Sequence, residues 1–257
     1  NGEALSKLNE PGLERYYNVL RENGSFDPEV LNNVELGMRY NNTDRGVKAS
    51  AVVFYSSRHD MQIKQWFTNE AEVRELGEQP EFVGYVSNTP NGANYGVETN
   101  IQYQLNQDVS VFAGVSLLST EIDDMYRLET DPETWEDVRV NINGREQAHA
   151  PSYQYQLGFN WQVADRITWN TSVNGRDEYY YSFSHDEKSQ AINLVNMSVT
   201  YQGDNFDVTL WGRNLGDKDY GVRGFYFGND PRDGWVAKSY EQLGEPSVFG
   251  LKLDVLF

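Results

Sequence analysis

Alternation with a period of two is the dominant feature of this sequence. In its last eleven residues, SVFGLKLDVLF (247–257), every second side chain is apolar: Phe249, Leu251, Leu253, Val255 and Phe257. Lys252 and Asp254 lie between them. Such a period is the signature of a β-strand whose two faces meet different surroundings. Two classes of protein produce that difference: a half-buried sheet of a soluble protein, and a membrane barrel with lipid outside and water inside.

The same alternation recurs along the chain. It is clear at 33–41, 93–105, 151–163 and 193–202, and weaker at 45–58, 107–120, 165–176 and 205–216. Together with the last segment, these make nine expected strands. The helical signal is poor, with one weak candidate over Pro11–Glu22. The sequence therefore predicts an all-β fold.

The spacers between these strands are alternately short and long. The short ones, at 41–46, 105–108, 163–165 and 202–205, contain the Gly, Asn and Asp residues that tight hairpin turns need. The long ones run over 68–92, 121–149, 179–190 and 220–246. One end of the sheet should therefore carry turns and the other end long loops. Up-and-down barrels of the outer membrane have this asymmetry, whereas Greek-key sandwiches mix their connections.

Composition narrows the class of protein further. The formal charge of -18, from 39 acidic and 21 basic residues, disfavours nucleic acid as a partner. No run approaches the roughly 18 apolar residues of a membrane-spanning helix. Cysteine is absent, which fits a bacterial envelope protein weakly. The first residues, NGEALSKLNE, contain no signal peptide, so either the protein is not exported or this is not its natural N-terminus.

Two motifs near the end of the chain carry a family resemblance. TLWGRNLGDKDY (209–220) and GEPSVFGLKLDVLF (244–257) resemble the C-terminal end of TonB-dependent outer-membrane receptors. The residues that match are Asn214, Leu215, Asp217, Lys218, Tyr220, Gly244, Pro246, Phe249, Leu251 and Phe257. The stretches 26–40, 92–105 and 144–162 are similar to upstream strands of the same family, so the resemblance covers most of residues 26–257.

The resemblance implies an antiparallel up-and-down barrel in the bacterial outer membrane, with short periplasmic turns and long extracellular loops. Receptors of the family have 22-stranded barrels with a plugged lumen. The chain should then supply about nine strands, the last nine of that barrel, with residues 1–29 as a strand-entry segment and 30–257 as barrel. An open sheet edge in lipid costs several kcal/mol for each unpaired group. We therefore expect a fragment, a partial chain or one piece of a split receptor.

The resemblance also implies partners. These are outer-membrane lipid, the missing N-terminal plug and barrel strands, and TonB, which acts through the absent N-terminal region. The barrel assembly machinery would recognise Phe257 as part of its terminal signal; from the residue alone, Phe257 is an apolar strand end. The expected function is import of a scarce solute, chiefly a ferric siderophore, with a glycan or cobalamin as alternatives. A passive porin and a soluble carbohydrate-binding sandwich remain open as other classes.

Catalytic and metal-binding motifs are missing from the sequence. It contains no nucleophile elbow, zinc-protease helix, P-loop or dinucleotide fingerprint, so we expect neither an enzyme nor a cofactor. His59, His149 and His185 are far apart and lack metal-ligand spacing. The acidic runs 121–124 and 129–137 lack the ordered spacing of a calcium-binding loop. No metal site is expected.

The candidate site residues lie in the long loops and on the polar face of the strands. Tyrosine, tryptophan and arginine make good recognition surfaces, so the expected ligand contacts are Tyr179, Tyr180, Tyr181, Arg223, Tyr226, Arg232 and Trp235. Alternatively, these residues pack on each other, or the arginines pair with nearby acids at 230, 233 and 241. Buried charges require partners, so a second set is expected to face the lumen and the plug: Glu35, Arg39, Glu98, Arg176 and Arg213.

Overall fold

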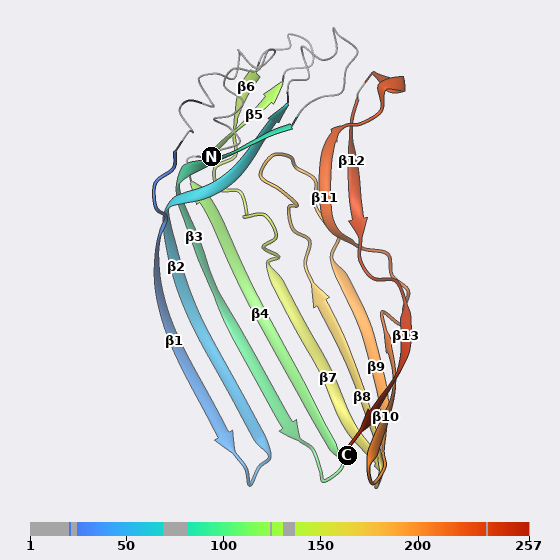
Figure 1. Cartoon of the computed structure of the whole chain (residues 1–257). Helices are drawn as coiled ribbons and strands as arrows, with labels where there is room; N and C mark the ends of the chain where they lie inside the picture. The colour runs from blue at the N-terminus through green and yellow to red at the C-terminus, as the bar shows by residue number, and fades with distance from the viewer. Residues whose placement is uncertain are drawn as a thin grey trace.

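The main structural element is one nine-stranded antiparallel sheet (Figure 1). The computed structural model describes residue 21 and residues 25–68, 82–123, 125–130, 137–234 and 236–256. The sheet contains, in spatial order, β1 (Val30–Asn42), β2 (Val47–Thr68), β3 (Phe82–Gln104), β4 (Val109–Asp123), β7 (Tyr153–Ala164), β8 (Ile167–Arg176), β9 (Ile192–Gln202), β10 (Phe206–Arg213) and β13 (Val248–Val255). All nine predicted strands are confirmed, and each neighbours the next one along the chain.

Two small hairpins interrupt the long connections. β5 (Tyr126–Thr130) pairs with β6 (Asp137–Asn141), and β11 (Gly221–Gly228) pairs with β12 (Ala237–Leu243) around the 3₁₀ helix η2 (Pro231–Asp233). The sequence prediction treated both regions as loops and was wrong there, because these short strands lack a sustained alternation. It also ended β2 too early, at 58 instead of 68, and β3 begins at Phe82, well inside the predicted loop 68–92. The weak helical signal at Pro11–Glu22 lies almost wholly outside the described residues.

The turns and the loops lie at opposite ends of the sheet, as the spacer lengths predict (Figure 1). The four tight connections, at 43–46, 105–108, 165–166 and 203–205, share the lower end. Gly46 in the first of them has φ 64°, a left-handed conformation that glycine adopts without strain. The hairpins and longer segments share the upper end. The connectivity is therefore an up-and-down meander without crossovers.

Strand register gathers the apolar residues on one face. Leu36 is opposite Val53, Val53 is opposite Val97, and Val97 is opposite Leu117, so the row continues from strand to strand. Leu36 is 78% exposed. An exposed apolar band across a whole sheet is what a lipid environment requires and what a soluble surface avoids.

The aromatic residues of β7 belong to this outer band. Tyr155 is opposite Val115 and Phe159 is opposite Val111, on the apolar face. Trp161 stacks on Trp169 of β8 at 6.0 Å between ring centroids and is 39% exposed. None of these three side chains packs inside a closed core, so the soluble-sandwich interpretation is not supported.

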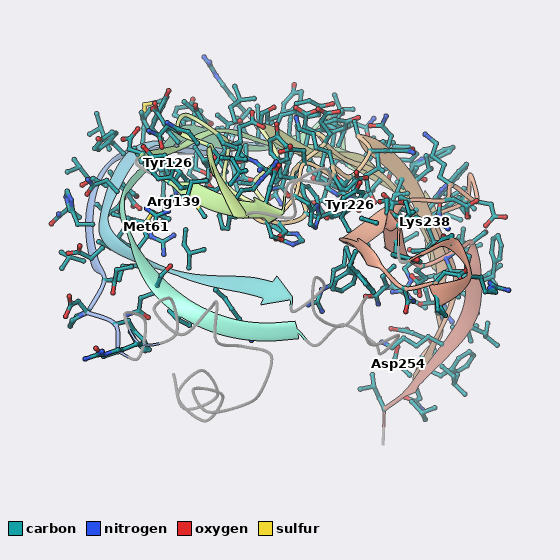
Figure 2. The ribbon with its side chains drawn as sticks, turned by 90° about the horizontal axis from the view of Figure 1, so that it is seen from above. Met61, Tyr126, Arg139, Tyr226, Lys238 and Asp254 are labelled. Atoms are coloured by element: carbon teal, nitrogen blue, oxygen red, sulfur yellow. The ribbon has the colours of Figure 1, made fainter. Side chains whose placement is uncertain are left out.

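Seen from above, the sheet is an open arc, and the hairpins lie on its hollow side (Figure 2). Two residues of the polar face reach those upper elements: Asn94 accepts a hydrogen bond from Gln147, and Arg176 donates to the main-chain oxygen of Gly221. The polar face is therefore the hollow side. On it, Phe112 lies over Gly158, where an added Cβ would be 2.4 Å from the ring. Glycine opposite an aromatic ring lets the sheet curve without a clash.

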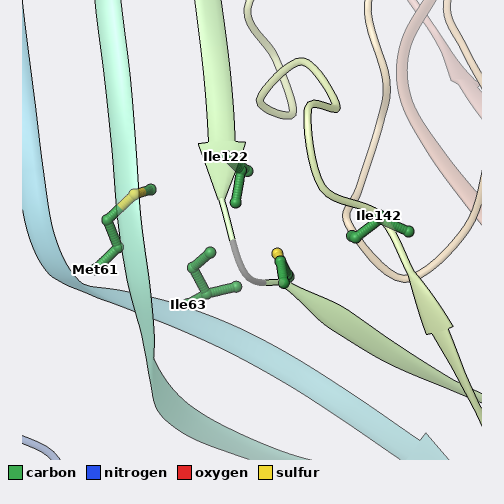
Figure 3. Close-up of a cluster of buried hydrophobic side chains, with 5 residues drawn as sticks. Met61, Ile63, Ile122 and Ile142 are labelled. Atoms are coloured by element: carbon green, nitrogen blue, oxygen red, sulfur yellow. The ribbon is translucent and has the colours of Figure 1, made fainter.

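Above the nine-stranded sheet, which we call the wall, β2 and β3 bend and cross the hollow side (Figures 1 and 2). The bend lies at Asp60, whose φ is 53°, and the side chain of Asn88 donates to the main-chain oxygen of Asp60 at 2.6 Å. Beyond the bend, five buried hydrophobic residues form a cluster in the loop region (Figure 3): Met61, Ile63, Ile122, Met125 and Ile142. The upper end is thus a packed layer. No helix within the described residues has the length and hydropathy to cross a membrane.

Candidate functional site

We use the term roof for the packed layer above the sheet: the β5–β6 hairpin, the segments 142–152 and 177–191, and the β11–β12 hairpin. Its attachment to the wall depends on Asn214, which directly follows β10. Asn214 is buried and has φ 46°. Its amide donates to the main-chain oxygens of Lys218 and Glu245 at 2.9 and 3.0 Å, and its side-chain oxygen accepts from the main-chain nitrogen of Lys218. This clasp closes the base of the connection that carries the β11–β12 hairpin.

Tyr179 and Tyr181 attach segment 177–191 to that hairpin. Both side chains are buried, and their rings meet edge to face at 5.8 Å. The Tyr179 hydroxyl donates to the main-chain oxygen of Val222, and the Tyr181 hydroxyl donates to Glu241 at 2.9 Å. Burial, and then the Glu241 carboxylate, raise the pKa of Tyr181, so the phenol stays protonated as a donor. In this structure, both predicted ligand contacts hold the roof together.

The ring of Tyr181 lies directly against the backbone of Gly224 in β11. A Cβ added at Gly224 would be 2.1 Å from the ring, so this contact needs glycine. Arg176 of β8 reinforces the same junction from below. Its guanidinium lies 4.4 Å from the Tyr179 ring centroid and donates to the Ser189 hydroxyl. Arg176 was predicted to face the lumen and the plug; it lies on the polar face, where it binds the roof.

Tyr180 points to a different set of partners. The Arg145 guanidinium carbon lies 3.9 Å from the centroid of its ring, and the Lys188 ammonium lies 4.2 Å from it. Lys188 also pairs with Glu178 at 2.9 Å. A ring with two cations on it is a cation–π cluster, in which the aromatic face offsets part of the repulsion between them.

The most accessible of the predicted contacts lie on the β11–β12 hairpin. Tyr226 is 48% exposed, and Arg223 lies over the ring of Phe225 at 4.9 Å. Arg232, at the tip, binds Asp230 through two hydrogen bonds of 2.9 and 2.8 Å, so the predicted alternative of pairing with a nearby acid is confirmed for it. Trp235 lies outside the described residues. Arg223 and Phe225 lie on one face of β11 and Tyr226 lies on the other. We call these three exposed side chains together the hairpin surface.

The sequence prediction missed a second cationic group in the roof. Arg127 and Arg145 converge on Asp186, with nitrogen–oxygen distances of 2.7 and 3.0 Å. His185, beside them, is buried, and its ring lies 6.3 Å from that of Tyr226. These residues come from separate loops, and pairs such as Arg127 and Asp186 have no spacing that a sequence pattern could reveal.

The other predicted lumen charges share the polar face of the sheet. Glu35 accepts a hydrogen bond from Asn33 at 2.8 Å. Arg213 pairs with Glu245 at 2.9 Å and lies over the ring of Trp211. Arg39 and Glu98 lie on the same face by register, opposite Ser50 and Val52 of β2. The structure does not bring these charges together at one site, and they are spread over the wall.

No group of three or more His, Asp or Glu side chains within the described part of the chain is arranged to hold a metal ion. Phe257, the proposed assembly signal, lies outside the described residues. What the geometry provides is a polar, curved wall with a packed roof on its hollow side. The roof presents tyrosine and arginine side chains, and the outer face presents an apolar band.

Comparison with known proteins decides the family. The sequence profile of the TonB dependent receptor-like β-barrel family matches residues 8–215. The chain belongs to this family. TonB-dependent receptors are outer-membrane proteins, and they are transporters, not enzymes. This TonB-dependent receptor chain therefore belongs to the bacterial outer membrane, with its apolar band facing lipid.

Solved structures agree on the fold. The ferric yersiniabactin uptake receptor FyuA from Yersinia pestis aligns with a TM-score of 0.63 at 18% identity, covering 90% of this chain and 30% of that one. The siderophore receptor PiuA from Acinetobacter baumannii gives 0.64 at 16% identity, with 90% and 29% covered. The copper transporter OprC gives 0.66 at 15% identity, with 91% and 32% covered. The chain thus aligns with less than a third of FyuA, PiuA and OprC.

Proposed function

We propose that this chain forms part of the wall and roof of a TonB-dependent transporter that imports a ferric siderophore. The observation that carries the proposal is the hairpin surface, on the hollow side of the wall (Figure 2). Arg223 lies over Phe225 there, and Tyr226 is 48% exposed. Siderophores bind iron through catecholate, hydroxamate or carboxylate oxygens. Arginine binds such anionic oxygens in paired hydrogen bonds, and aromatic rings cover the flat parts of the ligand.

The rest of the receptor follows from the same proposal. Among the described residues, β1 and β13 are the edge strands of the sheet. Edge strands carry unpaired backbone groups, so in lipid they need further strands on both sides. We expect the polar-face charges Glu35, Arg39 and Glu98 to meet an N-terminal plug, which TonB would act on. We keep residues 1–29 as the strand-entry segment and 30–257 as barrel. Phe257 remains our candidate for recognition by the assembly machinery.

The solved structures support a ferric siderophore as the cargo and leave copper as an alternative. FyuA is a ferric yersiniabactin uptake receptor and PiuA is a siderophore receptor, whereas OprC is a copper transporter. A glycan or cobalamin would also find aromatic platforms and amides on this surface. We favour the siderophore because the roof presents arginines beside tyrosines, and neutral glycans do not call for that charge.

A binding panel tests the proposal. The full-length receptor is purified in detergent, and quenching of its intrinsic fluorescence is measured with ferric catecholate, hydroxamate and carboxylate siderophores, cobalamin, a malto-oligosaccharide and copper. We expect one ferric siderophore class to saturate, and Arg223→Ala with Tyr226→Ala to weaken it by about tenfold, which is ~1.4 kcal/mol.

The matched control carries the same two residue types at the turn end, Arg45→Ala with Tyr103→Ala, and should leave affinity unchanged. Saturation by cobalamin, the glycan or copper alone would show that the cargo is wrong. An equal loss in both double variants would show that the hairpin surface is not the contact.

A further inference from the structure

Two buried arginines in the roof converge on one exposed carboxylate. Arg127 donates to both oxygens of Asp186, from Nη1 at 2.8 Å and from Nη2 at 2.7 Å. Arg145 Nη1 lies 3.0 Å from the Oδ1 atom of the same carboxylate. The side chains of Arg127 and Arg145 are only 11% and 7% exposed, whereas that of Asp186 is 67% exposed. The cations are thus fixed in the roof, and the anion comes from the solvent side.

Arg145 retains unused hydrogen-bonding capacity. Its Nη2 donates to the main-chain oxygens of Ser182 and His185. Its Nε and Nη1, both fully buried, make no hydrogen bond, because the N–H directions of Nη1 miss the nearby Asp186 oxygen. An unsatisfied buried donor costs free energy, most of all on a charged group. The Asp186 carboxylate therefore balances the charge of Arg145 but leaves the N–H donors of its Nε and Nη1 without acceptors.

Arg127 has more acidic partners than Arg145. Arg127 has a second acid, Glu129, which accepts from its Nε at 2.5 Å. For Arg145 the structure shows one ion pair, with Asp186. Burial lowers the pKa of Arg145, and the positive charge of Arg127 acts in the same direction, so Arg145 has much to gain from an anion with more oxygens. The Tyr180 ring covers the other side of the guanidinium at 3.9 Å.

We propose that Arg127 and Arg145 form an oxyanion site which Asp186 occupies in the free receptor, and that the carboxylate or phosphate group of a soluble ligand displaces Asp186 from it. An incoming group with three or four oxygens would bond Arg127 as Asp186 does and reach the free donors of Arg145. Asp186 then acts as an internal competitor that sets the affinity and excludes weak anions.

The surroundings favour a soluble ligand over a membrane lipid. His185, the neighbour of Asp186, packs towards Tyr226 of the β11–β12 hairpin on the hollow side, away from the lipid-facing band. The oxyanion site concerns an equilibrium at Asp186 and does not depend on the iron cargo or on the hairpin surface. It would hold for a receptor of any anionic solute.

Calorimetric titration of the full-length receptor with inorganic phosphate, at fixed ionic strength, tests the site. Asp186→Asn removes the competing charge with almost no change of shape, and should tighten phosphate binding by at least about tenfold. Glu187→Gln removes the same charge one residue further on, and should change it by less than about twofold. Adding Arg145→Gln to Asp186→Asn should remove the gain.

Three results of this titration would overturn the proposal. One is an equal shift in Asp186→Asn and Glu187→Gln, which would mean a general charge effect. Another is a gain that survives Arg145→Gln. The third is binding to phosphatidic acid in the detergent micelles but not to free phosphate, which would make the site a lipid contact.

Hydrogen exchange shows whether Asp186→Asn merely loosens the segment 182–188. With phosphate bound, the amides of 182–188 in this variant should recover the protection of the wild type. If they stay exposed at saturating phosphate, Asp186 is a structural anchor and the site is rejected.

Discussion

The side-chain amide of Asn214 donates a hydrogen bond of 3.0 Å to the carbonyl oxygen of Glu245, 31 residues further along the chain. Both residues lie inside the motifs by which the sequence resembles its family. The bond joins the end of β10 to the approach of β13, with the whole β11–β12 hairpin between them. The motif is therefore a structural clasp for the roof, and its asparagine also suits the left-handed backbone at φ 46°.

Replacing Asn214 by glycine should separate these two roles. Glycine keeps the backbone conformation but removes the side chain's hydrogen bonds, so we expect opening of the hairpin base to become easier by about 1–3 kcal/mol. Hydrogen exchange at 215–219 and 245–247 measures this. The control Asn205→Gly, in a turn at the opposite end of the sheet, should leave hydrogen exchange at 215–219 and 245–247 unchanged. Unaltered protection in Asn214→Gly would mean that backbone geometry alone holds the clasp.

Tyr181→Phe removes one hydroxyl from the junction between segment 177–191 and the hairpin. The lost hydrogen bond ends on the Glu241 carboxylate, so undocking should become easier by about 1.5–3 kcal/mol. The measurement is the rate of limited proteolysis within 177–191 in the folded receptor. Tyr103→Phe, on the lipid face, serves as the control. Equal cleavage in both variants would show that Tyr181 holds the junction by packing alone.

The roof should loosen in mild acid through His185. Burial, and then the positive charges of Arg145 and Arg127, lower the pKa of this imidazole below its ordinary 6.5, although Glu187 and Asp186 oppose them. The open roof therefore binds a proton more readily than the closed one. The free energy needed to open the roof has its full value above pH 6.5. It decreases as the pH is lowered further, by at most about 1.4 kcal/mol per pH unit.

Hydrogen exchange at 182–188, corrected for intrinsic rates, gives that pH dependence. His185→Asn should flatten it between pH 6.5 and 5, whereas His59→Asn in the wall should not. Asp186, whose pKa is held low by Arg127, loses its charge only in much stronger acid, so the two groups act in separate ranges. A slope that persists in His185→Asn would assign the effect to another group.

Gly158→Ala should impair the wall. The added Cβ would lie 2.4 Å from the Phe112 ring and 2.5 Å from the Thr171 oxygen, so the strands must shift, at a cost of about 1–3 kcal/mol. At Gly37, the nearest atom would be 3.5 Å away, so Gly37→Ala should be tolerated. The heat-induced gel shift of the folded barrel compares the two. Equal unfolding temperatures would contradict the close ring–glycine contact.

Most of the fold could be predicted because lipid and lumen impose a strict alternation on every wall strand. The spacer lengths then determined which end carries the loops. The β5–β6 and β11–β12 hairpins escaped prediction because their strands are short and lack a period of two. In β11, GVRGFYFG, exposed aromatic residues occur on both faces, at Phe225 and Tyr226.

The candidate site could be predicted only in part. Tyrosine and arginine content pointed to the loops that build the roof, but it did not separate Tyr181, which is buried, from Tyr226, which is exposed. Arg127 and Asp186 lie 59 residues apart and meet only because two loops fold onto each other. Sequence patterns reveal local periodicity, and contacts of this kind are set by tertiary packing.

Uptake of radioactive iron by living cells tests the central claim most directly. Iron-starved cells that carry this receptor as their sole transporter for the siderophore identified by binding are compared with cells carrying Arg223→Ala and Tyr226→Ala. We predict energy-dependent uptake that an uncoupler abolishes, with a rate reduced by about tenfold in the double variant at limiting ligand. Uptake that persists without energy, or is equal in both strains, would contradict the assignment of the hairpin surface as the binding surface of a TonB-dependent siderophore transporter.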